Sequence, residues 1–218
     1  FDACSRNGFK TNLSEVILMA DSNDSSKNSK NLLVWIIVVF VFIGAIAIFV
    51  VSFQKNTTDN FKKTSYPEDY SDYVEKAASD YNLDPALIYA IIRTESAFDP
   101  NAVSTAGARG IMQVMPSSFE WLMERRGTTG QYTADDLFDP AICIDYGSYL
   151  LRYFYDVYDD ERCAIAAYNA GFVVSDWLGD SDYSNDGKTL YSIPYPETSD
   201  YVDKVEEAKN MYIELYYS

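Results

Sequence analysis

The sequence predicts a mostly α-helical domain preceded by a single transmembrane helix. Three observations predict this class. A run of uncharged residues, LLVWIIVVFVFIGAIAIFVV, occupies positions 32–51 and matches the length that crosses a bilayer. From about residue 69 onward the apolar side chains recur with helical spacing, and no segment shows the alternation typical of a half-buried strand. With 218 residues, 48% of them apolar, the chain can form one core of ordinary domain size.

The chain is expected to have four parts. Residues 1–31 are rich in Ser, Asn and Asp, and we expect a disordered cytoplasmic segment. Residues 32–51 are the expected transmembrane anchor, residues 52–68 a polar linker and residues 69–218 the folded domain. A cleaved signal peptide is the competing interpretation, because Ala45-Ile46-Ala47 has the small-x-small form of a cleavage site. The apolar run continues past that site through Val51, which favours an uncleaved anchor.

Turn signals divide the folded domain into helices and irregular connections. The predicted helices are Ser71–Tyr81, Pro85–Phe98, Ser117–Arg126, Pro140–Tyr158, Glu161–Asn169 and Thr198–Tyr216. The irregular connections are expected at Asp99–Gly110, Gly127–Asp139 and Gly179–Pro196.

Composition excludes several classes of function. The sequence contains no histidine, which removes Ser-His-Asp and Cys-His triads and most zinc sites, so we expect no metal and no cofactor. The net charge is −16, and residues 61–218 hold 28 of the 33 acidic side chains. Such a surface argues against a nucleic-acid partner, since phosphate binding needs clustered Lys and Arg. The chemistry must therefore come from carboxylates.

Glu95 is the candidate general acid. Asp84 and Pro85 supply an N-cap and a first helical residue, so the phase of the following helix is well defined. In that phase Glu95 lies on the same face as Ile88, Ile91 and Ile92, near the carboxyl end of the helix. Burial and the helix dipole both disfavour its charged form, so its pKa should be raised. On spacing alone, a last-turn glutamate in solvent or paired with an arginine is the simpler interpretation.

The residues after Glu95 change that balance. The segment from Glu95 to Pro116 resembles the first motif of the soluble lytic transglycosylase catalytic domain. It begins with Glu95-Ser96 and ends with Gly110-Ile111-Met112-Gln113-Val114-Met115-Pro116. Further blocks follow in that family's order. They are Asp139-Pro140 with Ile144 and Gly147, Ala166-Ala167-Tyr168-Asn169-Ala170-Gly171, and Ile193-Pro194-Tyr195-Pro196-Glu197-Thr198 with Tyr201-Val202. The resemblance covers roughly residues 69–213, and it departs from the family at Cys143 and Ser199.

The resemblance implies a lysozyme-like fold and a role for particular residues. Glu95 would be the acid and base of glycosidic cleavage. The other matching positions would bind the sugar chain: Ser96, Ser104, Gln113, Met115, Tyr168, Asn169 and Glu197. Several of them have simpler explanations, because Met115 and Tyr168 suit ordinary packing and Glu197 suits the start of a helix.

The implied activity is that of a peptidoglycan lytic transglycosylase. It would cleave the β-1,4 bond between N-acetylmuramic acid and N-acetylglucosamine and leave 1,6-anhydromuramyl ends. The expected location is the cytoplasmic membrane, crossed once, with the domain on the cell-wall side. A lysozyme-like hydrolase and a non-catalytic wall-binding scaffold are the alternatives. The sequence also leaves open whether Cys143 and Cys163 form a disulfide or are two small buried hydrophobes.

Overall fold

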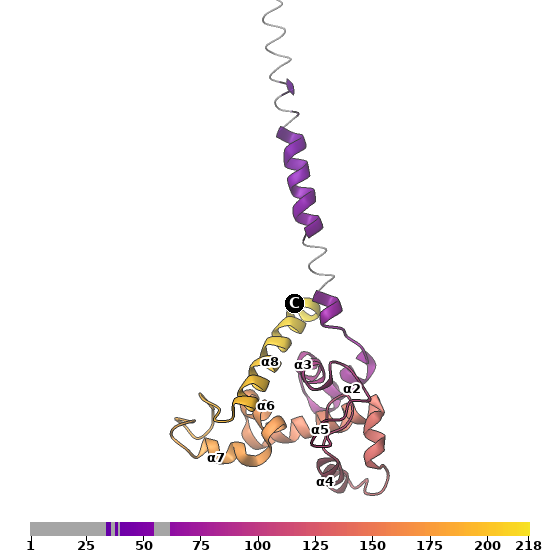
Figure 1. The fold of residues 1–218 in the computed structure, drawn as a ribbon, viewed down its shortest axis with the longest axis vertical. Coiled ribbons are helices and arrows are strands. Elements are labelled where there is room, and N and C mark those ends of the chain that lie inside the picture. Colours follow the sequence, from indigo (N-terminus) through magenta and orange to yellow (C-terminus); the bar gives the residue numbers. More distant parts are fainter. Residues whose placement is uncertain (1–33, 36–37, 39, 55–61) are drawn as a thin grey trace, which may run out of the picture. The chain divides into compact units, whose positions relative to one another are not determined.

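The computed structural model describes residues 34–35, 38, 40–54 and 62–218 (Figure 1). The chain divides between Asn60 and Phe61 into two units. In the first unit residues 40–54 are helical, and large apolar side chains such as Phe40 and Phe49 are 70% exposed. Among the described residues, no helix is both long enough and apolar enough to cross a membrane. The anchor expected at residues 32–51 lies partly outside the described residues, and the segment expected at 1–31 lies wholly outside them.

The second unit is helical, as the sequence predicts. Each of the six predicted helices is present, together with two short α-helical segments that are not among them, at residues 62–65 and at α7. The described residues contain no strand, only isolated bridges that join Val103 to Arg109 and Arg109 to Val114. The elements are α2 (Ser71–Tyr81), α3 (Pro85–Ser96), α4 (Pro116–Arg126), η1 (Ala134–Phe138), α5 (Pro140–Tyr158), α6 (Glu161–Ala170), η2 (Gly171–Val173), α7 (Val174–Leu178), α8 (Pro196–Tyr212) and a terminal π-helical turn, η3 (Ile213–Tyr217).

Five helix ends differ from the predicted ones: α4 begins one residue earlier, α6 ends one residue later, α8 ends at Tyr212 before η3, and the other two are the end of α3 and the start of α8. α3 ends at Ser96 and not at Phe98, because Ala97 and Phe98 both have positive φ angles, of 51° and 70°. α8 begins at Pro196, two residues before the predicted start. Proline suits that place because its fixed φ is helical and the first turn needs no N–H from it.

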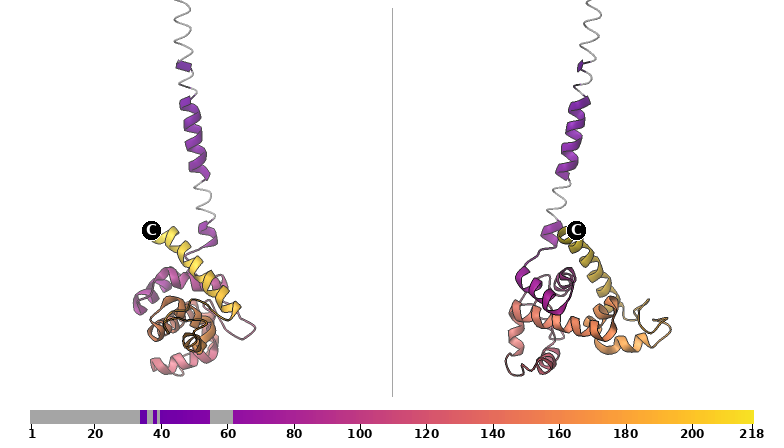
Figure 2. Two further views of the ribbon diagram at one scale, coloured as in Figure 1. Left: turned by 90° about the vertical axis from the view of Figure 1, so that its left-hand side faces the viewer. Right: turned by 180° about the vertical axis from the view of Figure 1, so that it is seen from behind.

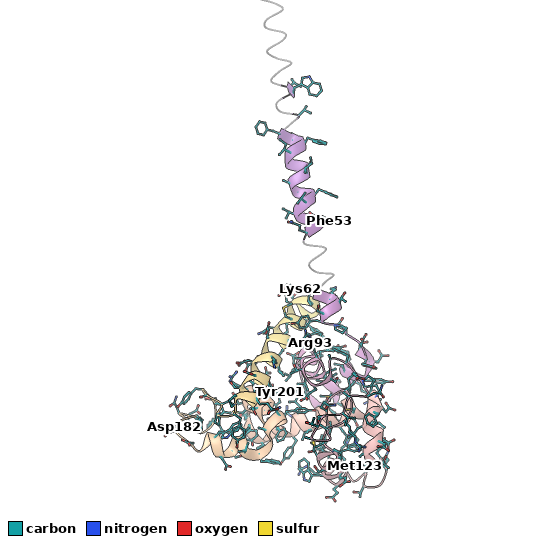
Figure 3. The ribbon with its side chains drawn as sticks, in the orientation of Figure 1. Phe53, Lys62, Arg93, Met123, Asp182 and Tyr201 are labelled. Atoms are coloured by element: carbon teal, nitrogen blue, oxygen red, sulfur yellow. The ribbon has the colours of Figure 1, made fainter. Side chains whose placement is uncertain are left out.

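Five helices form a closed ring around the core. α3 packs on α8, α8 on α6, α6 on α5, α5 on α2, and α2 returns to α3. Figures 1 and 2 show α8 along one edge of this ring, with α7 and the loop after it projecting from the same side of the domain. Asp182 lies on that projecting loop (Figure 3). The ring therefore brings the end of α3 next to α8, although the two helices are about a hundred residues apart in sequence.

α3 is the central helix of the core. Every residue from Ala86 to Ile92 is fully buried, so the buried surface extends all the way round this part of the helix. The face shared by Ile88, Ile91 and Ile92 is buried, as the sequence pattern predicts, and the other faces of this part of the helix are buried as well. Because α2 and α8 both pack on it, α3 has no face left for solvent until its last turn.

Residues 62–68 pack against the domain and do not belong to a free linker. The Arg93 Nε atom donates to the Ser65 carbonyl oxygen at 3.0 Å, and the Tyr212 hydroxyl donates to that of Pro67 at 3.0 Å. The Tyr216 hydroxyl donates to the Tyr66 carbonyl oxygen at 2.7 Å. Figure 3 shows Arg93 close to the chain segment that begins at Lys62. Residues 62–68, at the carboxyl end of the linker expected at 52–68, therefore contact the folded domain.

Candidate active site

Glu95 is held at the end of a rigid helix. The Asp84 side chain accepts the Ala86 N–H at 2.9 Å, and Pro85 occupies the first helical position, so α3 begins as predicted. The buried stretch that follows fixes the helix in the core. Glu95 is the next-to-last helical residue, just beyond that stretch, and is partly buried. The core thus fixes the position of its carboxyl group.

The environment of Glu95 favours its protonated form. Burial raises the pKa of the Glu95 carboxyl to about 7, against a smaller lowering effect of the hydrogen bond from Tyr201. The Tyr201 hydroxyl donates to Glu95 Oε1 at 2.8 Å, and Tyr201 itself is 92% buried (8% exposed). A carboxyl group with a pKa near 7 exists in both forms at neutral pH, as a group that first gives and then takes a proton must.

Tyr168 is the second tyrosine in the electrostatic environment of Glu95. Burial raises the pKa of Tyr168 well above its usual value, and the nearby Glu95 charge raises it further. The Tyr168 hydroxyl donates to the Met112 carbonyl oxygen at 2.9 Å. This hydrogen bond connects α6, which carries Tyr168 and Asn169, to the loop before α4, which carries Gln113.

Asn169 connects α6 to α8. The Thr198 hydroxyl donates to Asn169 Oδ1 at 2.8 Å, and Thr198 is buried whereas Asn169 is exposed. With its oxygen held by Thr198, the Asn169 amide has its nitrogen left to donate to a ligand. Thr198 and Tyr201 lie three residues apart on the buried face of α8. Side chains from this one face therefore donate hydrogen bonds to both Asn169 and Glu95.

A cavity of about 440 Å³ adjoins this cluster. It brings together three of the residues predicted to bind the sugar chain, namely Met115, Tyr168 and Asn169, and Met115 is 36% exposed. Most of the remaining wall is apolar or aromatic, as expected where a sugar ring lies against the protein. The other lining residues are Ser117, Ser118, Trp121, Leu150, Phe154, Ala167, Ala170, Gly171 and Phe172.

Three other predicted residues have their polar atoms engaged within the loop after α3. Ser96 Oγ donates to the Ile111 carbonyl oxygen at 2.7 Å, and Ser104 Oγ accepts the Ala108 N–H at 3.0 Å. Gln113 Nε2 donates to the carbonyl oxygens of Ala102 and Gly110 at 3.0 and 2.9 Å. These contacts shape the loop, and the substrate-binding roles expected of the three side chains remain predictions.

Glu197 lies in the first turn of α8 and is exposed. Among the described residues it has no hydrogen bond or ion pair, and Thr198 beside it makes the contact with Asn169. Sequence reasoning missed Tyr201 as a site residue. A signal for it existed, because the buried residues Thr198, Tyr201, Val202 and Val205 repeat with helical spacing on α8.

The two cysteines of this domain do not form a disulfide. Cys143 Sγ accepts the Met112 N–H at 3.4 Å, whereas Cys163 Sγ donates to the Lys188 carbonyl oxygen at 3.5 Å. Burial raises the pKa of Cys143 to about 11 and that of Cys163 to about 12. Both thiols are therefore protonated and unreactive at neutral pH, which agrees with the interpretation as small buried hydrophobes.

Comparisons with known proteins match the same part of the chain. The family model of the transglycosylase SLT domain matches residues 72–190. The soluble lytic murein transglycosylase of Escherichia coli K12 is 34% identical over 143 residues, which cover 64% of this chain and 22% of that protein. The membrane-bound lytic murein transglycosylase C of Actinobacillus succinogenes is 33% identical over 165 residues, which cover 66% of this chain and 46% of that protein. The chain therefore spans less than half the length of these curated relatives.

A solved structure has the same fold. The crystal structure of the 70 kDa soluble lytic transglycosylase from E. coli superposes with a TM-score of 0.63 at 28% sequence identity. The superposition covers 70% of this chain and 25% of the E. coli chain. Since the family model matches more than half of the residues, this chain belongs to the transglycosylase SLT domain family.

Proposed function

We propose that this protein is a peptidoglycan lytic transglycosylase with Glu95 as its general acid and base. It cleaves the β-1,4 bond between N-acetylmuramic acid and N-acetylglucosamine and leaves 1,6-anhydromuramyl ends. The observation that carries the proposal is the Glu95 carboxyl, which has a pKa of about 7 and is oriented by Tyr201 at the end of a buried helix. The names of the relatives, lytic murein transglycosylases, support the same activity.

The proposed reaction uses one carboxyl group twice. Protonated Glu95 gives its proton to the glycosidic oxygen as the bond to the muramyl C1 breaks, so the leaving sugar departs with a hydroxyl group. The substrate's own N-acetyl group stabilises the positive charge that develops at C1. Glu95, now a carboxylate, takes the proton from the muramyl 6-hydroxyl as that oxygen bonds to C1. The carboxyl group is thereby restored, and no water is consumed.

The electrostatics of Glu95 support a lyase over a retaining hydrolase. A retaining enzyme places a second carboxylate about 5 Å from the acid, where its charge raises the pKa of the acid by repulsion. Burial and the Tyr201 hydroxyl account for the shift of the Glu95 pKa, without a contribution from another carboxylate of the described residues. This favours attack by the substrate's own 6-hydroxyl over attack by a carboxylate of the protein.

The decisive variant is Glu95→Gln, assayed on purified cell wall. The amide keeps the shape of the side chain but cannot donate the proton, so cleavage should fall by at least about 100-fold while wall binding persists. Glu207→Gln is the matched control, because Glu207 is an exposed carboxylate on α8 with no hydrogen bond or ion pair among the described residues. Mass spectrometry should find product ends one water lighter than hydrated sugars and resistant to borohydride.

Each result has a clear meaning for the three candidate functions. Reducible, hydrated ends would make the protein a lysozyme-like hydrolase. Wall binding without cleavage by the unaltered protein would make it a non-catalytic scaffold. Full cleavage by the Glu95→Gln variant would refute the assignment of Glu95.

The same proposal places the domain on the cell-wall side of the cytoplasmic membrane, held by one transmembrane helix. The support is the uncharged run at residues 32–51 and the exposed apolar side chains of the helix at residues 40–54. The name of the A. succinogenes relative, a membrane-bound enzyme, points the same way. Fractionation of cells tests the anchor: the full chain should stay with membranes after an alkaline wash, and a chain that lacks residues 1–60 should be soluble.

A further inference from the structure

Arg125, at the end of α4, lies on an aromatic surface beside the cavity. Its guanidinium carbon is 5.1 Å from the centre of the Trp121 ring and 4.7 Å from the centre of the Tyr153 ring. The Tyr153 ring in turn meets the edges of Trp121 and Phe172, at centroid distances of 4.9 and 6.0 Å. Trp121 and Phe172 both line the cavity that also holds Tyr168 and Asn169.

Arg125 differs from the other arginines of the described residues in its partners. Four of the others form ion pairs with carboxylates, and Arg93 donates to a backbone carbonyl. Within residues 62–218, Arg125 makes no hydrogen bond or ion pair, and its side chain is exposed. Its positive charge is therefore available, next to the cavity, in a protein whose net charge is −16.

The position of the Arg125 guanidinium suits the binding of an anion as well as packing on the two aromatic rings. A guanidinium group stacked on aromatic rings leaves its N–H donors pointing outward in its own plane, where they fit the two oxygens of a carboxylate. The acidic surface of the domain repels an anionic ligand, so a local cation beside the cavity offsets that repulsion where the ligand binds.

We propose that Arg125 binds a free carboxylate of a peptide stem on a muramyl residue, while a sugar ring lies against Trp121 and Phe172. This inference rests on the proposed function, because that function supplies a glycan strand with carboxylate-bearing peptides as the substrate. It makes Arg125 a residue that selects stem-bearing strands over bare glycan. Arg125 would act on binding and not on the bond that breaks.

The test compares Arg125→Met with Arg125→Lys on three soluble glycan substrates. These are strands with intact peptide stems, strands from which an amidase has removed the stems, and stem-bearing strands whose carboxylates have been converted to amides. Arg152→Met is the matched control, since Arg152 also stacks on a tyrosine but pairs with Asp156. Thermal unfolding of each variant checks that the domain is folded.

Arg125→Met should raise KM on stem-bearing strands by about tenfold and leave kcat unchanged. On amidated strands its KM should equal that of the unaltered protein. On bare strands, which keep only the lactyl carboxylate beside the sugar ring, its KM should change less than on stem-bearing strands. The KM of Arg125→Lys on stem-bearing strands should lie between those of the unaltered protein and Arg125→Met, because lysine keeps the positive charge but lacks the paired N–H donors. Equal effects on all three substrates, or none on any, would overturn the proposal. A preference that survives amidation would also overturn it, because the stem would then be recognised through groups other than its carboxylates.

Binding to the Glu95→Gln protein separates this inference from the proposed function. Calorimetry of stem-bearing strands with Glu95→Gln, and with Glu95→Gln that also carries Arg125→Met, should show about tenfold weaker binding for the second. This difference needs no cleavage. If the unaltered protein cleaved no glycan but this difference in affinity persisted, the proposed function would be wrong and the contact between Arg125 and the stem would stand. If the two variants bound equally well, the proposed contact between Arg125 and the stem would be wrong.

Discussion

A single hydrogen bond connects the last helix of the domain to the candidate acid. Tyr201 donates to Glu95, and burial opposes the charged form of the same carboxyl group. The two effects act in opposite directions on the pKa of Glu95, because a donor stabilises the carboxylate and burial destabilises it. Burial is the larger effect, which leaves the pKa at about 7 and the acid form populated at neutral pH.

Tyr201→Phe should therefore move the pH dependence of cleavage upward. The variant keeps the buried ring but loses the hydroxyl that lowers the pKa of Glu95, so that pKa rises. Cleavage needs protonated Glu95 and falls as pH rises through its pKa, so the alkaline limb of kcat/KM should shift to higher pH. Rates measured from pH 5 to 9 check this. A limb that stays in place or moves downward would show that Tyr201 does not act through Glu95.

At the scale of elements, the loop between α3 and α4 depends on one crowded glycine. Gly110 has a φ of +76°, and a Cβ atom at this residue would lie 1.9 Å from the Leu137 carbonyl oxygen. Gly107, in the same loop, has a φ of +92° but open space around the same position. Both residues need the left-handed backbone, yet only Gly110 lets η1 approach the loop.

The two glycines form a matched pair for stability measurements. Gly107→Ala should cost about 1 kcal/mol of unfolding free energy, the ordinary penalty for a positive φ. Gly110→Ala should cost about 3 kcal/mol or more, because the backbone of Leu137 must also move. Denaturant unfolding of both variants gives the comparison. Equal losses would mean that the contact between η1 and the loop adds nothing beyond the backbone conformation.

At the scale of the whole molecule, the segment before α2 belongs to the second unit. Residues 65–67 accept hydrogen bonds from Arg93, Tyr212 and Tyr216, and the Arg93 guanidinium also lies 4.0 Å from the centre of the Tyr66 ring. The segment thereby contacts both α3, which carries Glu95, and the end of α8.

A chain that begins at Asp69 should be less stable than one that begins at Phe61. The shorter chain loses five hydrogen bonds to later residues, made by Lys62 and by the carbonyl oxygens of residues 65–68, together with the ring of Tyr66. These contacts contribute about 3 kcal/mol. For a domain of this size the loss corresponds to a fall in Tm of roughly 10 °C. Calorimetry of the two soluble chains measures it, and equal Tm values would contradict the structural role of residues 62–68.

The sequence by itself determined the helical class and most helix ends, and it indicated Glu95 as the candidate acid. These depend on local information: the Asp84-Pro85 start, the spacing of the isoleucines and the motif that ends at Pro116. It also indicated Tyr168 and Asn169, which the structure places beside the cavity. The expected anchor and the proposed sugar-binding roles remain predictions.

Only the tertiary structure decided what surrounds the acid. Tyr201 is about a hundred residues from Glu95 in sequence, and their contact exists because the helical ring places α8 against α3. The same closure buries α3 on all sides, separates Cys143 from Cys163 and engages Gln113 within its own loop. Periodicity and motifs in the sequence indicate the type of each element and which of its faces is buried. Which residue of another element packs against that face depends on how all the elements pack around one core.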